Sequence, residues 1–191
     1  EHITVRQYSI GLFYGGLLVL MLFTAYLFVL FDRRHYLHLV GYQFCFLLTL
    51  LAFDGLAYEY IWPFSPWWAN RAITFWGGLS CFWMAQLPRL FLQLEGREGF
   101  YPHLFERLAL FAIVASILSF ILNHALSVSL MMILMSVITL TQIVGSIKRR
   151  TLDSFKMTWF LVGHLLVFIG FITFWLMLDG YLPTQSLTRF S

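Results

Sequence analysis

Charged residues are scarce in this chain. Asp, Glu, Lys and Arg make up 11% of the 191 residues, whereas 60% are hydrophobic and the mean hydropathy is +0.80. A soluble domain carries about 25% charged residues. So few charges cannot cover a surface that faces water, so the composition excludes an ordinary soluble domain and predicts a membrane protein. The net charge of +3 is then explained by cations at membrane edges, and we expect no nucleic-acid partner.

Cysteine and catalytic motifs are also scarce. The two cysteines, Cys45 and Cys81, both fall inside apolar stretches, and their spacing matches neither a disulfide framework nor a metal site. The sequence has no phosphate-binding glycine loop, no nucleophile elbow and no histidine pair at metal-ligand spacing inside a span. We therefore expect no catalytic residue, no bound cofactor and no metal ion.

Long apolar stretches dominate what is present. A helical membrane span needs about 20 apolar residues, and six stretches approach or exceed that length. They lie at about residues 9–31, 37–61, 72–92, 107–123, 126–147 and 157–178. The pattern predicts an all-α, polytopic helical membrane bundle in one domain, 1–191. We expect the second stretch to continue as helix through Asp54 and Gly55, and residues 93–106 to form an irregular connection.

The basic residues alternate between the connections. One set of alternate connections holds nine of the 12 Lys and Arg residues, namely Arg33, Arg34, Arg89, Arg97, Arg107, Lys148, Arg149, Arg150 and Lys156. The other set holds Arg6, Arg71 and Arg189. Because Lys and Arg are retained on the cytoplasmic side during insertion, this bias places the N-terminus outside.

The two ends of the sequence also carry expectations. The chain begins without Met or a signal peptide, and its first span starts soon after Glu1. We expect an outer segment before Glu1 and a seventh span after Ser191.

The connection after the second span carries the first candidate site. Asp54 and Glu59 either contact a ligand or an outer domain, or they are solvated residues at a helix end. Trp62, Trp67 and Trp68 stand in a proline-containing loop, and such rings settle at the headgroup layer. We expect these five residues to couple the bundle to a ligand or outer domain.

Glycines and one proline mark the second candidate, a helix-packing or switch site. Gly11 and Gly15 in the first span, and Gly77 and Gly78 in the third, allow close approach of helices. They serve either a dimer or moving contact, or ordinary packing within one copy. Pro88 is expected to kink the third span or to mark where it leaves the membrane.

Histidines are the remaining ionisable candidates. His164, within the sixth span, could sense protons, bind a cofactor or donate an interhelical hydrogen bond. His35 and His38 are three residues apart and form either half of a metal site or part of a basic turn. His38 and His164 should lie at different depths, which disfavours a haem held by both. The inner face collects six candidates for a membrane-embedded enzyme: His35, His38, Glu95, Glu98, His103 and Glu106.

The order of short landmarks is informative as a set. Residues 11–16 read GLFYGG, residues 32–34 read DRR, residues 54–63 read DGLAYEYIWP and residues 89–92 read RLFL. This order resembles the membrane domain of the bacterial seven-transmembrane receptors with diverse intracellular signalling modules. The resemblance implies an outer sensory β-sandwich domain before the first span. It also implies a cytoplasmic histidine kinase, diguanylate cyclase or phosphatase after the seventh.

The resemblance therefore predicts a transmembrane sensor rather than an enzyme. Such a domain would lie in the bacterial inner membrane and relay a periplasmic signal to a cytoplasmic output, with the lipid bilayer and the fused domains as partners and a homodimer as one arrangement. Two alternatives stay open from the residues themselves: a small transporter or a membrane-embedded metal or haem enzyme subunit, and a purely structural subunit of a larger complex.

Overall fold

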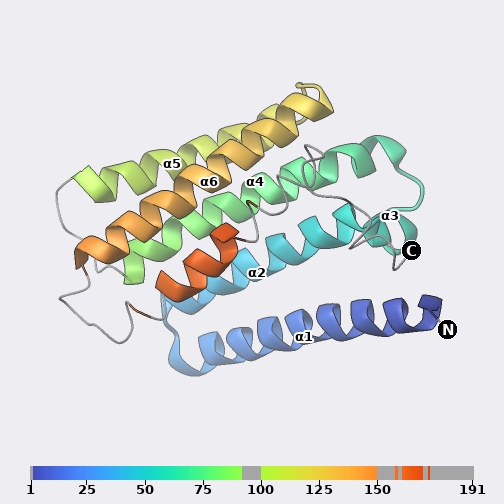
Figure 1. The fold of residues 1–191 in the computed structure, drawn as a ribbon, viewed down its shortest axis with the longest axis horizontal. Helices are drawn as coiled ribbons and strands as arrows, with labels where there is room; N and C mark the ends of the chain where they lie inside the picture. The colour runs from blue at the N-terminus through green and yellow to red at the C-terminus, as the bar shows by residue number, and fades with distance from the viewer. Residues whose placement is uncertain (1, 92–99, 150–157, 159–160, 170–171, 173–191) are drawn as a thin grey trace.

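The computed structural model describes residues 2–91, 100–149, 158, 161–169 and 172, and over these residues the fold is all-α, as predicted. The helices are α1 (His2–Phe31), α2 (Arg34–Phe53), α3 (Leu56–Tyr60), α4 (Pro66–Phe91), α5 (Phe100–Leu118) and α6 (His124–Arg149). The long helices lie side by side in alternating directions (Figure 1). Residues 161–169 are helical as well.

The alternation gives the bundle two ends. The Asp54 end comprises the start of α1, residues 54–66 and the turn at residues 119–124, whereas the Arg34 end comprises residues 32–34, the end of α4, the start of α5 and the end of α6. Five of the described arginines lie at or near the Arg34 end, namely Arg33, Arg34, Arg89, Arg107 and Arg149. Arg6 and Arg71 lie near the Asp54 end, so the charge alternation in the sequence becomes a charge difference between the two ends.

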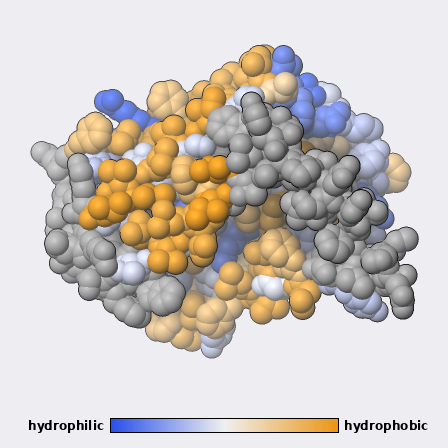
Figure 2. Space-filling view, viewed as in Figure 1, coloured by the Kyte–Doolittle hydropathy of each residue, from blue (hydrophilic) through white to orange (hydrophobic). Residues whose placement is uncertain are grey.

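Four described stretches are long and apolar enough to cross a membrane: Gly11–Phe31, Arg34–Phe53, Phe100–Leu118 and His124–Ile147. Large apolar side chains on these helices remain exposed, including Leu12 at 81% and Val29 at 80%. Figure 2 shows broad apolar surface over the helices and hydrophilic residues gathered where α5 joins α6. Exposed apolar surface of this extent is stable when lipid covers it.

The central helix is α4. It packs against α2, α5 and α6, whereas α1 packs mainly against α2 at the edge of the bundle (Figure 1). α4 buries small side chains such as Ala72, Ser80 and Ala85, which lets neighbouring backbones come close. Because protein surrounds it on several sides, α4 can carry polar residues such as Gln86. On a lipid-facing helix, such residues would cost free energy.

The buried core lies between α4, α5 and α6. Its members are mostly small or flexible apolar side chains, namely Cys81, Met84, Ala85, Phe105, Leu108, Ala109, Ala112, Met135 and Ile138. Phe105 and Ile138 are completely buried. Methionine adapts its shape to irregular gaps, so this core can follow small shifts of the helices around it.

The second apolar stretch is not one continuous helix, contrary to the prediction. α2 ends at Phe53, Gly55 takes a left-handed conformation with φ of 79°, and α3 begins at Leu56. Glycine has no β-carbon and adopts positive φ without strain. The pattern of apolar residues could not show this break, because the break consists of only two residues, Asp54 and Gly55.

The connection before α5 is also more helical than predicted. α5 starts at Phe100 and includes Pro102, whereas residues 93–106 were expected to be irregular. Proline is tolerated in a first turn because the N–H groups there have no intrahelical partner anyway. At its other end α5 stops at Leu118, short of the predicted residue 123, and hydrogen-bonded turns lead through Ser119 to Leu122.

Some predictions lie outside the described residues. These are the end of the third span at Leu92, the acidic residues Glu95 and Glu98, half of the 157–178 span and the chain from residue 173 onward.

Candidate functional site

An aromatic cluster occupies the Asp54 end. Trp62 and Trp68 meet edge to face with ring centroids 6.0 Å apart, and Trp68 contacts Phe75 at 5.4 Å. Phe120 lies 6.0 Å from both Trp67 and Trp68. The three predicted tryptophans are therefore brought together, and they join the start of α4 to the turn between α5 and α6.

Arg71 is held against this cluster. Its guanidinium carbon lies 4.7 Å from the centroid of the Trp67 ring, a cation–π arrangement. Its Nε donates a 3.3 Å hydrogen bond to the carbonyl oxygen of Phe120. One turn of α4 thus places a cation between an aromatic face and the start of the α5–α6 turn.

A cavity of about 370 Å³ opens beside Arg71. Its lining residues are mostly of polar type and come from the start of α4 and the turn before α6, namely Asn70, Arg71, Thr74, Ser119, Leu122, Asn123 and His124. His124 Nδ1 lies 3.0 Å from the carbonyl oxygen of Asn70 and so connects the two walls. Sequence reasoning missed this cavity. Arg71, a cation at the start of the third predicted span, was the available signal.

The two candidate carboxylates, Asp54 and Glu59, each accept a hydrogen bond from a tyrosine. Asp54 Oδ2 accepts a 2.6 Å hydrogen bond from the Tyr14 hydroxyl and so ties α1 to the end of α2. Glu59 accepts a hydrogen bond from Tyr60, and that bond raises the pKa of the exposed Tyr60 phenol above its ordinary value. Both carboxylates are exposed. Asp54 therefore positions α1 in this structure.

The glycine pair of α4 is a close-packed seam. A β-carbon on Gly78 would lie 2.9 Å from Ser116 Oγ and 3.1 Å from Ser116 Cα, and one on Gly77 would overlap the sulfur of Met131. Ser116 also donates a 2.5 Å hydrogen bond to the carbonyl oxygen of Phe75. Sequence reasoning missed a third glycine, Gly41 on α2, where a β-carbon would lie 2.6 Å from Trp83 Cε2.

The glycines of α1 behave differently. Among the described residues, no atom would lie within 4 Å of a β-carbon on Gly11, Gly15 or Gly16. The sequence left packing within one copy as an alternative role for Gly11 and Gly15. No described residue packs against them in that way. These glycines form an open patch on the edge helix.

Pro88 is bridged by a side chain from α6. Proline lacks the N–H that would bond the carbonyl four residues earlier, which here belongs to Met84. The Gln142 side chain fills this gap, because its Nε2 donates a 2.7 Å hydrogen bond to Met84 O. Gln142 is completely buried, and α4 continues past Pro88 to Phe91. The sequence placed Pro88 correctly in the third helix but not the residue that compensates for it.

His35 and His38, which the sequence left as half of a metal site or part of a basic turn, each pack on an aromatic ring. His35 packs on Tyr36 at 4.4 Å between ring centroids, and His38 packs on Trp83 at 5.5 Å. No group of three or more His, Cys, Asp or Glu suited to a metal ion occurs among the residues that the structure describes. His164 lies in the helical residues 161–169 and is half-buried.

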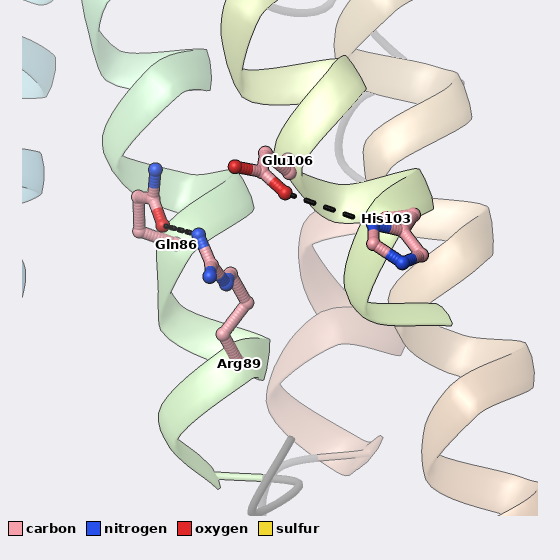
Figure 3. Close-up of polar contacts among 4 residues, drawn as sticks. All are labelled: Gln86, Arg89, His103 and Glu106. Carbon is pink, nitrogen blue, oxygen red and sulfur yellow. Dashed lines mark hydrogen bonds and ion pairs between the residues drawn. The ribbon is translucent and has the colours of Figure 1, made fainter. Parts of the chain in front are cut away.

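Two polar pairs mark the Arg34 end, on α4 and α5 (Figure 3). Arg89 donates a 3.2 Å hydrogen bond to Gln86 Oε1, and His103 Nδ1 lies 3.9 Å from Glu106 Oε2. The His103 and Glu106 side chains are 67% and 64% exposed, and exposed pairs of this kind stabilise a fold only slightly.

A family model for the 7TM diverse intracellular signalling domain matches residues 6–191. The chain belongs to this family. It is therefore a multi-pass membrane domain of the receptors of 7TM diverse intracellular signalling, as its sequence landmarks indicated. Membrane signalling domains of this family are generally not catalytic. Comparisons with curated proteins and with solved structures gave no match.

Within this 7TM signalling domain, the structure separates two groups of residues. The Asp54 end holds the tryptophans, Arg71 and the cavity, which lie where α4 starts and where α5 turns into α6. The interior of the bundle holds the α4 seam and the Gln142–Met84 bond. The helix α4 runs through both groups.

Proposed function

We propose that this domain is the transmembrane relay of a receptor in a bacterial inner membrane. It transmits a periplasmic event to a cytoplasmic output such as a histidine kinase or a diguanylate cyclase. The family match over residues 6–191 carries this proposal. The arginines at the Arg34 end support an orientation with that end in the cytoplasm, because basic residues are retained there.

The moving element in this proposal is α4. It begins in the Trp67–Arg71 region and ends at the Arg34 end, so one helix joins the two ends of the bundle. The close seam at Gly78 and Ser116 supports a sliding contact, because few side chains must change rotamer when two backbones shift along one another. The methionines of the core can adapt to such a shift.

The Gln142–Met84 bond is proposed as the latch between two arrangements. It is the interhelical bond that stabilises α4 at Pro88, and its 2.7 Å length makes it sensitive to a shift of about one ångström. Gln142 Oε1, in contrast, is buried without a hydrogen-bond partner among the described residues. An unsatisfied buried acceptor costs about 1–3 kcal/mol, so a second arrangement that satisfies it lies within reach in free energy.

A homodimer is part of the proposal. The open patch of Gly11, Gly15 and Gly16 lies on α1 at the edge of the bundle. Glycines spaced by four residues support tight pairing of membrane helices. A second copy packed there would place its own α1 against this patch.

The test uses the full-length receptor and the activity of its output domain in membrane vesicles. Gln142→Leu removes the latch, and Pro88→Ala restores the N–H that bonds Met84 and makes the latch redundant. We expect each substitution to change basal output or its response severalfold, and Gly15→Leu to reduce output through the dimer. Thr141→Val is the matched control, because the Thr141 hydroxyl donates to Val137 within its own helix.

Expression and thermal unfolding of each variant separate signalling defects from folding defects. If Gln142→Leu, Pro88→Ala and Gly15→Leu all reach the membrane and all leave output unchanged, the relay through α4 is wrong.

A further inference from the structure

The cavity beside Arg71 is a site that the relay proposal does not use. Its volume of about 370 Å³ falls in the range of small-molecule sites, about 300–1,000 Å³. It is formed between the start of α4 and the turn that leads into α6. Thr74 and Ser119 are almost fully buried in its wall, at 2% exposure each, so the cavity reaches into the bundle.

Within the described part of the chain, the charge at this cavity is positive and no carboxylate offsets it. No Asp or Glu of the described residues lies within ion-pair distance of Arg71. The guanidinium uses Nε for the Phe120 carbonyl and its face for Trp67. Its two terminal nitrogens make no hydrogen bond within the described part of the chain. A cation held rigidly in this way is pre-organised to bind an oxyanion with two parallel hydrogen bonds.

The turn before α6 adds to the positive electrostatic potential at the cavity. Asn123 caps the helix, because its Oδ1 accepts a 2.9 Å hydrogen bond from the backbone N–H of Leu126. The start of α6 at His124 borders the cavity, and the partial positive charge of a helix N-terminus favours anions. The helix start reinforces a site that Arg71 and the cavity already define.

We propose that this cavity binds an oxyanion group, a carboxylate or a phosphate, between Arg71 and the start of α6. The carrier is either a small soluble anion or the headgroup of an anionic phospholipid, since the tryptophans place this end at headgroup depth. Binding would join α4 to the α5–α6 turn through one charged group. This inference stands apart from the relay proposal because it concerns binding alone.

The experiment measures binding to the full chain in nanodiscs. Succinate and inorganic phosphate are titrated by calorimetry into phosphatidylcholine nanodiscs, and native mass spectrometry counts retained phosphatidylglycerol when that lipid is included. We expect saturable binding of a soluble anion, or retained phosphatidylglycerol that competes with it. The first outcome assigns the site to a soluble ligand and the second to a lipid headgroup.

Two substitutions test the assignment to Arg71 and the start of α6. Arg71→Gln should weaken binding about tenfold or more, as expected for the loss of a charged hydrogen-bonding partner worth about 1.5–3 kcal/mol. Asn123→Asp keeps the helix cap, because Asn and Asp cap equally well, but it places a negative charge at the cavity. It should therefore weaken anion binding while the unfolding temperature stays equal or rises.

Arg34→Gln is the control, because it removes an exposed cation at the opposite end of the bundle. Its affinity should match that of the unmodified chain. The proposal is overturned if neither anion nor lipid binds saturably, or if Arg71→Gln and Asn123→Asp both bind like the unmodified chain. Failure of this test leaves the relay through α4 untouched, since that is measured as signalling output.

Discussion

At the scale of single residues, glycines of similar sequence context have opposite surroundings. Gly78 is pressed against the backbone of Ser116, Gly77 against the flexible end of Met131, and Gly15 faces open space among the described residues. All three read as small residues in apolar stretches. Their roles differ because a glycine matters only where another helix approaches it.

Alanine substitutions at these glycines should follow that order. Gly78→Ala should destabilise the domain by about 1–3 kcal/mol, because overpacking a well-packed site forces backbone shifts. Gly77→Ala should cost less, because the Met131 side chain can move. Gly15→Ala should be neutral or slightly stabilising in the monomer, because alanine favours helix by about 1 kcal/mol over glycine. Thermal unfolding in detergent measures all three, and equal effects at Gly78 and Gly15 would contradict the seam.

At the scale of elements, α1 is the most weakly attached of the long described helices. In its membrane-spanning stretch, Gly11–Phe31, 6% of the apolar segment is buried within the protein. The corresponding share in the α6 stretch, His124–Ile147, is 39%. Its neighbour in the described bundle is α2, and the Tyr14–Asp54 hydrogen bond holds the two together near the Asp54 end. A helix with so little buried surface opens more easily than the core.

Tyr14→Phe should therefore loosen α1 without loosening the core. Loss of an exposed hydrogen bond to a carboxylate should lower the local opening free energy by about 1 kcal/mol, or roughly fivefold faster exchange. Hydrogen–deuterium exchange over residues 2–31 measures this effect, with residues 100–118 as the internal reference. Asp54→Asn is the matched control, because an amide oxygen still accepts the bond from Tyr14. Uniformly faster exchange in both regions would instead indicate global destabilisation.

At the scale of the whole molecule, the two ends of the bundle differ in charge. Most of the described arginines lie at the Arg34 end, and the tryptophan cluster with Arg71 lies at the other end. Phe64, at the Asp54 end, is 96% exposed. The two ends can therefore be addressed separately by chemical labelling.

Labelling of intact bacterial cells should show which end faces out. With Cys45 and Cys81 replaced by serine, Phe64→Cys should react with a membrane-impermeant maleimide in intact cells. Arg34→Cys should react only after the cells are permeabilised, because its cationic connection is predicted to be cytoplasmic. Gel-shift detection of the label distinguishes the two. The reverse pattern would overturn the proposed orientation and would place the cavity at the cytoplasmic face.

The sequence by itself determined that the chain is helical, that it belongs in a membrane and where its charges alternate. Insertion of a helix depends on its own transfer free energy and on its flanking cations. Both depend only on residues that are consecutive in the sequence. The family landmarks are also local strings, which is why they were readable without a structure. The tryptophans Trp62, Trp67 and Trp68 are also close in sequence, although the predicted loop was wrong for Trp67 and Trp68, which lie in α4.

Only the tertiary structure decided which helix lies at the centre, which glycines pack and where a cavity forms. Gln142 reaches Met84 across 58 positions, and Arg71 reaches Phe120 across 49. In lipid, apolar side chains gain little by facing protein rather than acyl chains. Hydrophobic pattern therefore does not show which face of a helix packs, and close contacts and interhelical hydrogen bonds make that choice.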